Sequence, residues 1–361
     1  MASLSDLPIR DDLRGLSPYG APQKHVRIQL NVNENTHPIP EAVATDIVAS
    51  LARAILRVNR YPDREFTELR ESLAGYLGHG LTAENIWAAN GSNEVLQQIL
   101  QAFGGPGRTV LGFPPTYSMH SIIASGTGTT WIAGERDAGF ELSPATVTRW
   151  IEETSPDIVF LCSPNNPTGT PVSLETIAAA YEATSGIVVV DEAYAEFAPD
   201  GVESALSLLP GRERLLISRT MSKAFAFAGA RVGYLAADPA VTDALRLVRL
   251  PYHLSALTQA AAIAALAHAP EMLAMVEDIK QQRDRMLVEL PALGYTVHDS
   301  AANFVLFGGV DDPHATFEAL LAEDIIIRDV GIPHHLRVTA GSRAETTAFL
   351  AAIGRLRRIA P

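Results

Sequence analysis

Seven short apolar runs alternate with helical patterns between Glu41 and Arg249, and this alternation limits the possible folds more than any other feature. The runs occupy residues 86–89, 109–113, 129–132, 157–161, 187–190, 214–218 and 232–236. Strands that alternate with helices are typical of a parallel sheet covered by helices. The continuous β-branched run at 187–190 is typical of a strand buried on both faces. The sequence therefore predicts an α/β fold with a mostly parallel seven-stranded sheet.

The pattern changes from Pro251 onward, which predicts a second, smaller α+β domain. Two helices and two strands are expected there, at residues 258–267, 272–290, 303–307 and 336–339. The predicted division is a large domain at 41–250, a small domain at 251–361 and an arm at 1–40. We expect part of this Pro- and Asn-rich arm to join the small domain. A length of 361 residues agrees with about two domains.

Composition excludes several classes of protein. The formal net charge of −13 argues against a nucleic-acid partner, because phosphates require a basic face. A single cysteine, Cys162, cannot form an internal disulfide, so a cytoplasmic location is expected. Residues 1–14 lack the apolar core of a signal peptide, and no membrane span is predicted.

The histidines predict no metal site. His334 and His335 are adjacent, so on a strand their side chains would face opposite ways. We expect His37, His120 and His253 to be packing or surface residues.

Lys223 has the most informative surroundings in the chain. Two hydroxyl residues lie just before it, small and apolar residues follow from Ala224, and Arg231 lies eight positions later. A buried lysine loses its proton more readily, and the neutral amine can attack an aldehyde. The arginine and the hydroxyls suit a phosphate group. The pattern therefore predicts pyridoxal 5'-phosphate as a cofactor, whereas an isolated lysine would be a solvated surface charge.

Asp191 directly follows the buried run at 187–190. The carboxyl ends of strands in open α/β sheets face the crevice that binds ligands. There the carboxylate could pair with the pyridine nitrogen and keep it protonated. The attraction is roughly 4 kcal/mol at about 4 Å and an effective dielectric near 20. A helix N-cap is the alternative role for this aspartate.

The cofactor phosphate is expected between two segments. Residues 91–94 follow the run at 86–89 and begin a predicted helix that continues to Phe103. Free N–H groups and the positive end of that helix favour an anion. The predicted phosphate ligands are Ser92, Asn93, Thr220, Ser222 and Arg231. For Ser92 a plain N-cap is the alternative.

The segment 162–169 contains two prolines and two asparagines, which predicts an irregular turn with outward-pointing amides. Its Asn166 begins an Asn-Pro-Thr-Gly sequence that lies 25 residues before Asp191 and 57 before Lys223. Tyr194 follows the aspartate by three positions, and Arg231 follows the lysine by eight. With this spacing the chain resembles the fold-type I pyridoxal-phosphate aminotransferases.

Further motifs narrow the resemblance. They lie at residues 16–20, 30–35, 60–63, 89–94, 302–306 and 336–339 and so extend over nearly the whole chain. Together they resemble the histidinol-phosphate aminotransferase family in its actinobacterial form. This resemblance implies transfer of an amino group from L-histidinol phosphate to 2-oxoglutarate, which gives imidazole acetol phosphate and L-glutamate in histidine biosynthesis.

The resemblance also implies roles around the cofactor. Lys223, Asp191 and Tyr194 would be the catalytic residues. Tyr117 would stack on the pyridine ring, and Asn166 with Tyr194 would hydrogen-bond the ring oxygen. Tyr61 would reach the cofactor phosphate of the neighbouring subunit, so the implied active unit is a homodimer.

Substrate anions are expected at two arginines. Arg337 and Arg328 match the anion-binding arginines of the family, and a guanidinium binds carboxylate or phosphate in bidentate fashion. Seen alone, each would be a charged residue on an exposed strand. Tyr19 and the segment Asn33 to Asn35 are expected to border the imidazole end of the substrate.

Three other functions stay open. An aromatic amino-acid aminotransferase would share nearly every cofactor residue and differ in the substrate pocket. A decarboxylase of the same fold would release carbon dioxide and need no oxo acid. A non-catalytic regulator that holds the cofactor would need a DNA-reading domain, and this acidic chain has no spare length for one.

Overall fold

The computed structural model describes residues 3, 6–15, 18–20 and 22–359, and its largest sheet has seven strands. These are β2 (Ile86–Ala89), β3 (Thr109–Gly112), β4 (Thr130–Ala133), β5 (Ile158–Cys162), β6 (Ile187–Asp191), β7 (Leu215–Thr220) and β8 (Gly233–Ala236). Their order is β2-β8-β7-β6-β5-β3-β4. β8 pairs antiparallel with both neighbours, and the other neighbouring pairs are parallel. The predicted α/β fold is confirmed, and each strand end lies within two residues of its prediction.

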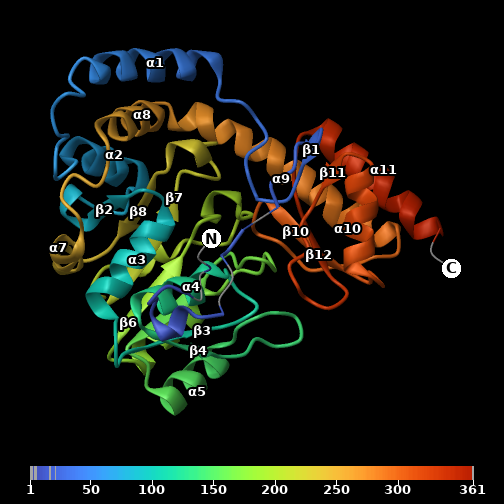
Figure 1. Cartoon of the computed structure of the whole chain (residues 1–361), viewed down its shortest axis with the longest axis horizontal. Helices are drawn as coiled ribbons and strands as arrows, with labels where there is room; N and C mark the ends of the chain where they lie inside the picture. The colour runs from blue at the N-terminus through green and yellow to red at the C-terminus, as the bar shows by residue number, and fades with distance from the viewer. Residues whose placement is uncertain (1–2, 4–5, 16–17, 21, 360–361) are drawn as a thin grey trace.

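Helices connect and cover these strands (Figure 1). They are α3 (Ser92–Phe103), α4 (Met119–Thr127), α5 (Pro144–Thr154), α6 (Leu174–Ala183) and α7 (Pro239–Val248). Local chemistry sets several of their starts, since Ser143, Ser173 and Asp238 each accept a backbone N–H of the first turn. All residues of β5 are buried, which explains the unbroken apolar run in the sequence.

A second unit contains a three-stranded antiparallel sheet of order β12-β10-β9. Its strands are β9 (Thr296–Val297), β10 (Phe304–Gly308) and β12 (Leu336–Thr339), and its helices are α9 (Ala269–Ala292), α10 (Pro313–Ala322) and α11 (Arg343–Ile359). From the arm, β1 (Ile28–Gln29) pairs in parallel with β11 (Ile325–Ile326). Part of the N-terminal arm therefore lies on this unit, on the right of Figure 1.

A group of three helices, α1 (Glu41–Ile55), α2 (Thr67–Leu77) and α8 (Ala256–Ala267), packs beside β2 at the edge of the large sheet, at the upper left of Figure 1. From α8 the long helix α9 runs across to the second unit (Figure 1). Short 3₁₀ helices occur at Asp11–Leu13, Ala83–Asn85, Ala195–Phe197, Ala205–Leu208 and Ala228–Ala230. The division into 1–40, 41–250 and 251–361 remains a proposal.

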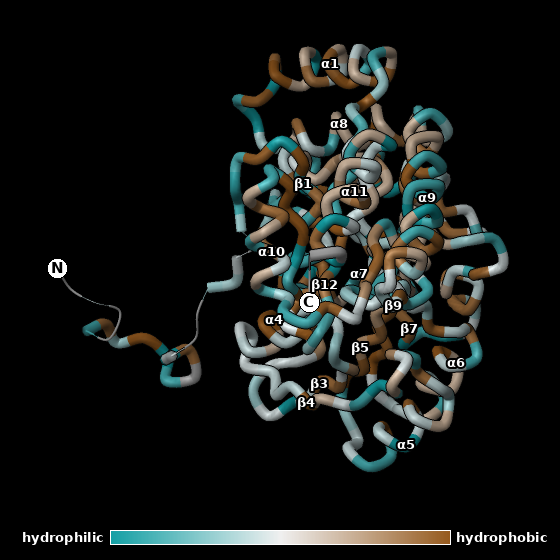
Figure 2. The backbone as a smooth tube through the Cα atoms, turned by 90° about the vertical axis from the view of Figure 1, so that its right-hand side faces the viewer, coloured by the Kyte–Doolittle hydropathy of each residue, from teal (hydrophilic) through white to brown (hydrophobic). Residues whose placement is uncertain are grey.

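Hydropathy along the tube in Figure 2 is highest in the central strands such as β5. In the same view the backbone of residues 6–15 lies apart from the rest of the chain. The segment contacts α4 through the Arg10 guanidinium, which donates to the carbonyls of Ser125 and Gly126. Over the described ranges, no single helix is long and apolar enough to cross a membrane. By length and composition alone, α8 and α9 would pass together as a pair bent by 77°.

Candidate active site

A cavity of about 840 Å³ lies at the carboxyl ends of β5, β6 and β7. This is where open α/β sheets bind ligands. The structure brings most of the predicted site residues to its wall: Tyr19, Ser92, Asn93, Tyr117, Asn166, Asp191, Tyr194, Thr220, Ser222, Lys223, Arg231, Arg328 and Arg337. Residues 16 and 17 of the motif before Tyr19 lie outside the described residues.

Two predicted site residues do not line this cavity. Tyr61 is 80 % exposed, and its ring stacks on Tyr252 with centroids 4.5 Å apart. The Asn35 amide donates to the Ala224 carbonyl over 3.3 Å, and its Oδ1 accepts the His37 N–H over 2.9 Å. This geometry does not support a substrate contact by Asn35, because the side chain is used to hold the arm against the lysine loop.

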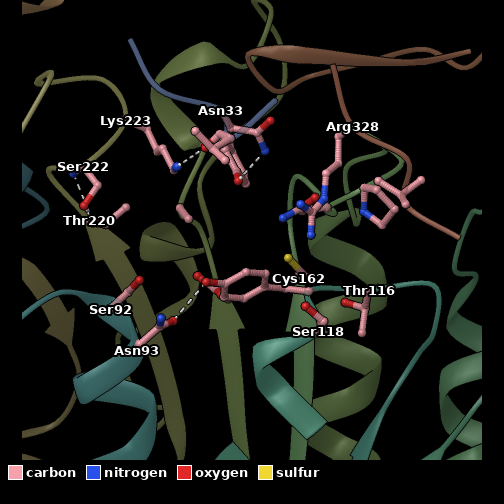
Figure 3. Close-up of a pocket in the computed structure, with 18 of the residues that line it drawn as sticks. Asn33, Ser92, Asn93, Thr116, Ser118, Cys162, Thr220, Ser222, Lys223 and Arg328 are labelled. Carbon is pink, nitrogen blue, oxygen red and sulfur yellow. Dashed lines mark hydrogen bonds between the residues drawn. The ribbon is translucent and has the colours of Figure 1, made fainter. Parts of the chain in front are cut away.

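Lys223 follows β7 and points into the cavity (Figure 3). Its Nζ donates to the Val32 carbonyl over 3.1 Å. Burial, and after it the positive charge of Arg337, lowers the pKa of Lys223 to about 8, against an opposing effect of Glu34. A substantial fraction of the amine is therefore neutral near pH 8 and can act as a nucleophile.

Asp191 ends β6 at the floor of the cavity and is 2 % exposed. Its Oδ2 lies 3.1 Å from Nε2 of His120, a residue of α4. Among the described residues its Oδ1 has no hydrogen-bond partner. A buried carboxylate oxygen without a partner is costly, and a protonated ring nitrogen would satisfy it.

His120 is a functional candidate that the sequence did not single out. The prediction of a packing residue is correct in that the ring is buried against Phe160, with centroids 5.0 Å apart. The contact with Asp191 adds a second role, since it fixes the orientation of the carboxylate. The two residues are 71 positions apart, and no local motif indicated that they would meet.

Two glycines allow close contacts at the first turn of α3, one with the Arg231 guanidinium and one between β8 and the helix backbone. A Cβ on Gly91 would collide with the Arg231 guanidinium, and a Cβ on Gly233 would collide with the backbone N of Ser92. Gly91 also has a φ of 87°, which a glycine adopts without strain. These close approaches place a positive charge beside the helix end that carries free N–H groups.

Hydroxyl groups lie in the same part of the cavity as Arg231 and the start of α3, which we call the phosphate corner. Thr220 Oγ1 donates to Ser222 Oγ over 3.0 Å and accepts the Ser222 N–H over 3.1 Å. Figure 3 shows both residues on the same side of the cavity as Ser92 and Asn93. Together with Arg231, this corner supplies the donors that a phosphate monoester requires.

Tyr117 lies in the loop just before α4, and its Oη donates to Asn93 Oδ1 in the first turn of α3 over 3.1 Å. Burial is the main cause that raises the pKa of Tyr117 above its ordinary value. The phenol therefore stays protonated and keeps this hydrogen bond.

Arg337 lines the cavity and pairs with Arg328, whose side chain lies across the cavity from Ser92, Thr220 and Ser222 in Figure 3. Nη1 of Arg337 donates to Asn166 Oδ1 over 2.5 Å, and its Nη2 donates to the Asn31 carbonyl over 2.8 Å. Among the described residues its buried Nε has no partner. Burial lowers the pKa of Arg337 to about 10, so the side chain stays charged at neutral pH. At 7 % exposure it is not the solvated strand residue that the alternative prediction assumed.

Arg328 adds a second positive charge beside Arg337. The two residues exchange backbone hydrogen bonds of 2.9 Å in both directions. Figure 3 shows the Arg328 side chain pointing into the cavity. Two guanidinium groups at one wall can bind a phosphate or a carboxylate.

Asn33 joins the arm to the cavity through Tyr194. Its Nδ2 donates to Tyr194 Oη over 2.9 Å, and its Oδ1 accepts the Thr339 hydroxyl over 3.1 Å. Burial is the main cause that raises the pKa of Tyr194, which keeps the phenol protonated. The sequence predicted Asn33 at the imidazole end of the substrate, whereas its side chain contacts a predicted cofactor ligand.

The turn at 162–169 differs from its prediction. Its amides were expected to point outward, but Asn165 is fully buried. The Asn165 side chain donates to the Pro115 carbonyl over 2.9 Å and accepts the Thr116 hydroxyl over 2.9 Å. The prediction was wrong because a buried turn must satisfy its polar groups internally.

The placement of the adjacent histidines also differs. His334 and His335 lie in a turn before β12 and not on a strand. The strand geometry that would point their side chains in opposite directions is therefore absent at these two residues. Within the described part of the chain, no group of three or more His, Cys, Asp or Glu side chains could hold a metal ion.

Comparisons with known proteins agree with this geometry. The family model for aminotransferase class I and II matches residues 26–353. A histidinol-phosphate aminotransferase of Paenarthrobacter aurescens is 63% identical over 97% of this chain and 95% of its own length. The chain belongs to the histidinol-phosphate aminotransferase family. Another member, from Frankia casuarinae, is 58% identical over 97% of this chain and 90% of its own length.

Solved structures support the same fold for this family member. A histidinol-phosphate aminotransferase from Sinorhizobium meliloti, in complex with pyridoxal-5'-phosphate, has a TM-score of 0.88 at 24% identity and covers 99% of both chains. The enzyme from Clostridium acetobutylicum has a TM-score of 0.82 at 24% identity, over 92% of this chain and 99% of its own. The predicted resemblance to actinobacterial histidinol-phosphate aminotransferases and the predicted fold type are both confirmed.

Proposed function

We propose that the cavity holds pyridoxal 5'-phosphate and transfers an amino group from L-histidinol phosphate to 2-oxoglutarate. The products are imidazole acetol phosphate and L-glutamate. The position of Lys223 carries the proposal: an amine with a pKa lowered to about 8 lies between two anion-binding walls, one with Arg231 and the other with Arg337. Relatives at 63% and 58% identity are named for this activity.

The residues present fit the cofactor at three points. Arg231 and the start of α3 suit its phosphate, and Oδ1 of Asp191, which has no partner within the described part of the chain, suits its ring nitrogen. Lys223 suits its aldehyde. When bound, pyridoxal 5'-phosphate supplies a carbonyl that accepts the substrate amine and a ring that withdraws electrons from it.

Lys223 is the group that moves the proton. Its neutral amine, favoured by burial and by Arg337, can take a proton from the substrate carbon that bears the amine. Asp191, oriented by His120, places its carboxyl group at the floor of the cavity. Tyr194 stays protonated because its pKa is raised, so it can donate to an oxygen anion in front of it.

One wall serves both substrates in this proposal. The amino donor carries a phosphate, whereas 2-oxoglutarate carries two carboxylates, and a guanidinium binds either anion. Nε of Arg337 has no hydrogen-bond partner among the residues that the structure describes, and Arg328 lies beside it. Tyr19 lines the same cavity, 51 % exposed, where it can border the imidazole ring.

A homodimer completes the site in this proposal. Tyr61 does not line the cavity of its own chain, so a contact with the cofactor phosphate would have to reach a second copy. Exposed apolar side chains lie along α1 and in nearby segments: Val48, Ile55, Leu56, Val58, Leu247, Leu250 and Tyr252. Figure 1 shows α1 at the outer edge of the molecule, where a second copy can cover it. Sedimentation analysis that gives only monomers at micromolar concentration would contradict this part.

We also place the enzyme in the cytoplasm, on the buried free thiol of Cys162. Fractionation of cells that produce the protein at native level tests this placement. Recovery in the membrane or secreted fraction would contradict it.

The direct test mixes the cofactor-loaded enzyme with L-histidinol phosphate alone and follows the cofactor spectrum. We expect conversion to the aminated cofactor at micromolar donor, and reversal on addition of 2-oxoglutarate. Phenylalanine at millimolar concentration is the control donor. The opposite preference would assign the chain to aromatic amino-acid substrates, and release of carbon dioxide would indicate a decarboxylase.

A further inference from the structure

His298 and His335 lie on either side of the central strand β10. His298 directly follows β9, and His335 directly precedes β12. Gly308 of β10 lies between them and allows the His335 ring to approach, since a Cβ at this position would lie 2.6 Å from Nε2 of His335. The two rings meet across this glycine, with their Nε2 atoms 3.3 Å apart. Neither residue lines the cavity described above.

The proton on His335 can be placed from its surroundings. Its Nδ1 lies 2.7 Å from the Pro333 carbonyl, which can only accept a hydrogen bond. The neutral ring therefore carries its proton on Nδ1 and presents the lone pair of Nε2 toward His298. Histidines that bind metals are commonly oriented in this way, by an N–H donated to a backbone carbonyl.

The separation of the two nitrogens matches a metal site. Two nitrogens bound to tetrahedral zinc at about 2.0–2.1 Å lie about 3.3 Å apart, which is the distance found here. A direct N–H···N hydrogen bond is the alternative, and 3.3 Å is long for such a bond. The orientation of His335 is compatible with both arrangements.

Phe140 closes one side of the pair. It belongs to the loop between β4 and α5, and its ring centroid lies 4.9 Å from that of His298 and 6.0 Å from that of His335. The Phe140 carbonyl accepts hydrogen bonds from Arg136 and Thr170, which hold the loop in place. Figure 1 shows this loop reaching from the large sheet toward β10 and β12.

We propose that His298 and His335 bind a divalent transition-metal ion of the zinc class through their Nε2 atoms, with water as the remaining ligands. Imidazole nitrogens are ordinary ligands for such ions. The exposed Asp299 follows His298 and adds a favourable negative charge nearby. Arg328 to Val330 line the cavity a few residues before His335, so a bound ion would also anchor the segment that forms its rim.

The test is calorimetric titration of the chelator-treated, cofactor-loaded enzyme with Zn²⁺. Loading with cofactor keeps the cavity occupied during the titration. We expect one Zn²⁺ per chain, and at least about tenfold weaker binding in His298→Asn and in His335→Asn. His334→Asn is the matched control, because its Nδ1 contacts the Val310 carbonyl and its ring is not part of the pair. Unchanged binding in both test variants, or an equal loss in the control, would overturn the proposal.

A measurement on the unaltered protein covers the possibility that a variant fails to fold. With ¹⁵N-labelled histidine, addition of Zn²⁺ should shift the Nε2 resonances of His298 and His335 and leave those of His334 in place. Resonances of the pair that stay unchanged at saturating Zn²⁺ would show a hydrogen-bonded pair only and would refute the site.

Discussion

The two anion-binding walls of the cavity are built in different ways. At the phosphate corner, Ser92, Thr220 and Arg231 come from or next to strands that are neighbours in one sheet, and Gly91 and Gly233 allow close contact. At the opposite wall, Arg337 is held by Asn166 and by the Asn31 carbonyl, which lie 171 and 306 positions away in the chain.

This difference separates cofactor binding from substrate binding. The phosphate corner is fixed by the sheet itself, so changes there should weaken the cofactor and leave substrate affinity nearly intact. The opposite wall depends on segments from the arm, the turn after β5 and the second unit. Changes there should alter substrate affinity while the cofactor stays bound.

Lys223→Ala should have the largest effect, because the proposed function uses this lysine both to bind the cofactor and to transfer the proton. We expect kcat to fall by at least about 10⁴-fold, since the proton-transferring amine is lost. Borohydride reduction followed by peptide mass spectrometry should find no cofactor on the protein. Lys280→Ala, which removes an amine paired with Glu277, is the control and should behave as wild type. Cofactor still bound covalently in Lys223→Ala would show that another lysine is used.

A pair of arginine variants tests the separation directly. Arg231→Gln should weaken cofactor binding by roughly 10- to 100-fold, which corresponds to the 1.5–3 kcal/mol of a charge-assisted contact. Arg337→Gln should raise KM for both substrates by a similar factor and leave cofactor binding within about threefold. Cofactor affinity is measured by equilibrium dialysis, and KM by initial rates.

The contrast between these two variants is the informative result. If Arg337→Gln raises KM for one substrate alone, the two anions use separate pockets. If it releases the cofactor as readily as Arg231→Gln does, the walls are coupled and the comparison fails.

The pH dependence of cofactor loading should follow the titration of Lys223. Lys223 must be neutral to react, and its pKa is lowered to about 8, so the neutral fraction is about one tenth at pH 7 and one half at pH 8. The rate at which the cofactor-free enzyme takes up cofactor should therefore rise roughly fivefold from pH 7 to pH 8 and level off above it. Stopped-flow absorbance measures this rate.

Arg337 also lowers this pKa, so Arg337→Gln should move the loading profile toward higher pH. Removal of a positive neighbour favours the protonated lysine and so raises its pKa. A profile that stays in place would mean that burial alone sets the pKa.

The sequence predicted best what neighbouring residues determine. Uninterrupted apolar runs such as 187–190 gave the strands, and Lys223 with Arg231 is a local pattern that reached the cavity as expected. His120 was not recognised as a partner of Asp191, because a contact over 71 positions leaves no local signal. The outward orientation predicted for Asn165 failed for the same reason, since the groups that bury it come from residues 115 and 116.

Two asparagines of the arm give the smallest expected effects and test its part in the second wall. Asn33→Ala removes the donor to Tyr194 Oη, and loss of a neutral hydrogen bond of about 1 kcal/mol should lower kcat/KM roughly fivefold. Asn35→Ala is the matched comparison two positions away. Its side chain donates to the Ala224 carbonyl, next to Lys223, and does not line the cavity, so kcat/KM should change less than about twofold. Steady-state rates with L-histidinol phosphate decide between them. A larger loss in Asn35→Ala would restore the substrate contact predicted from the sequence, and it would show that the arm moves inward when substrate binds.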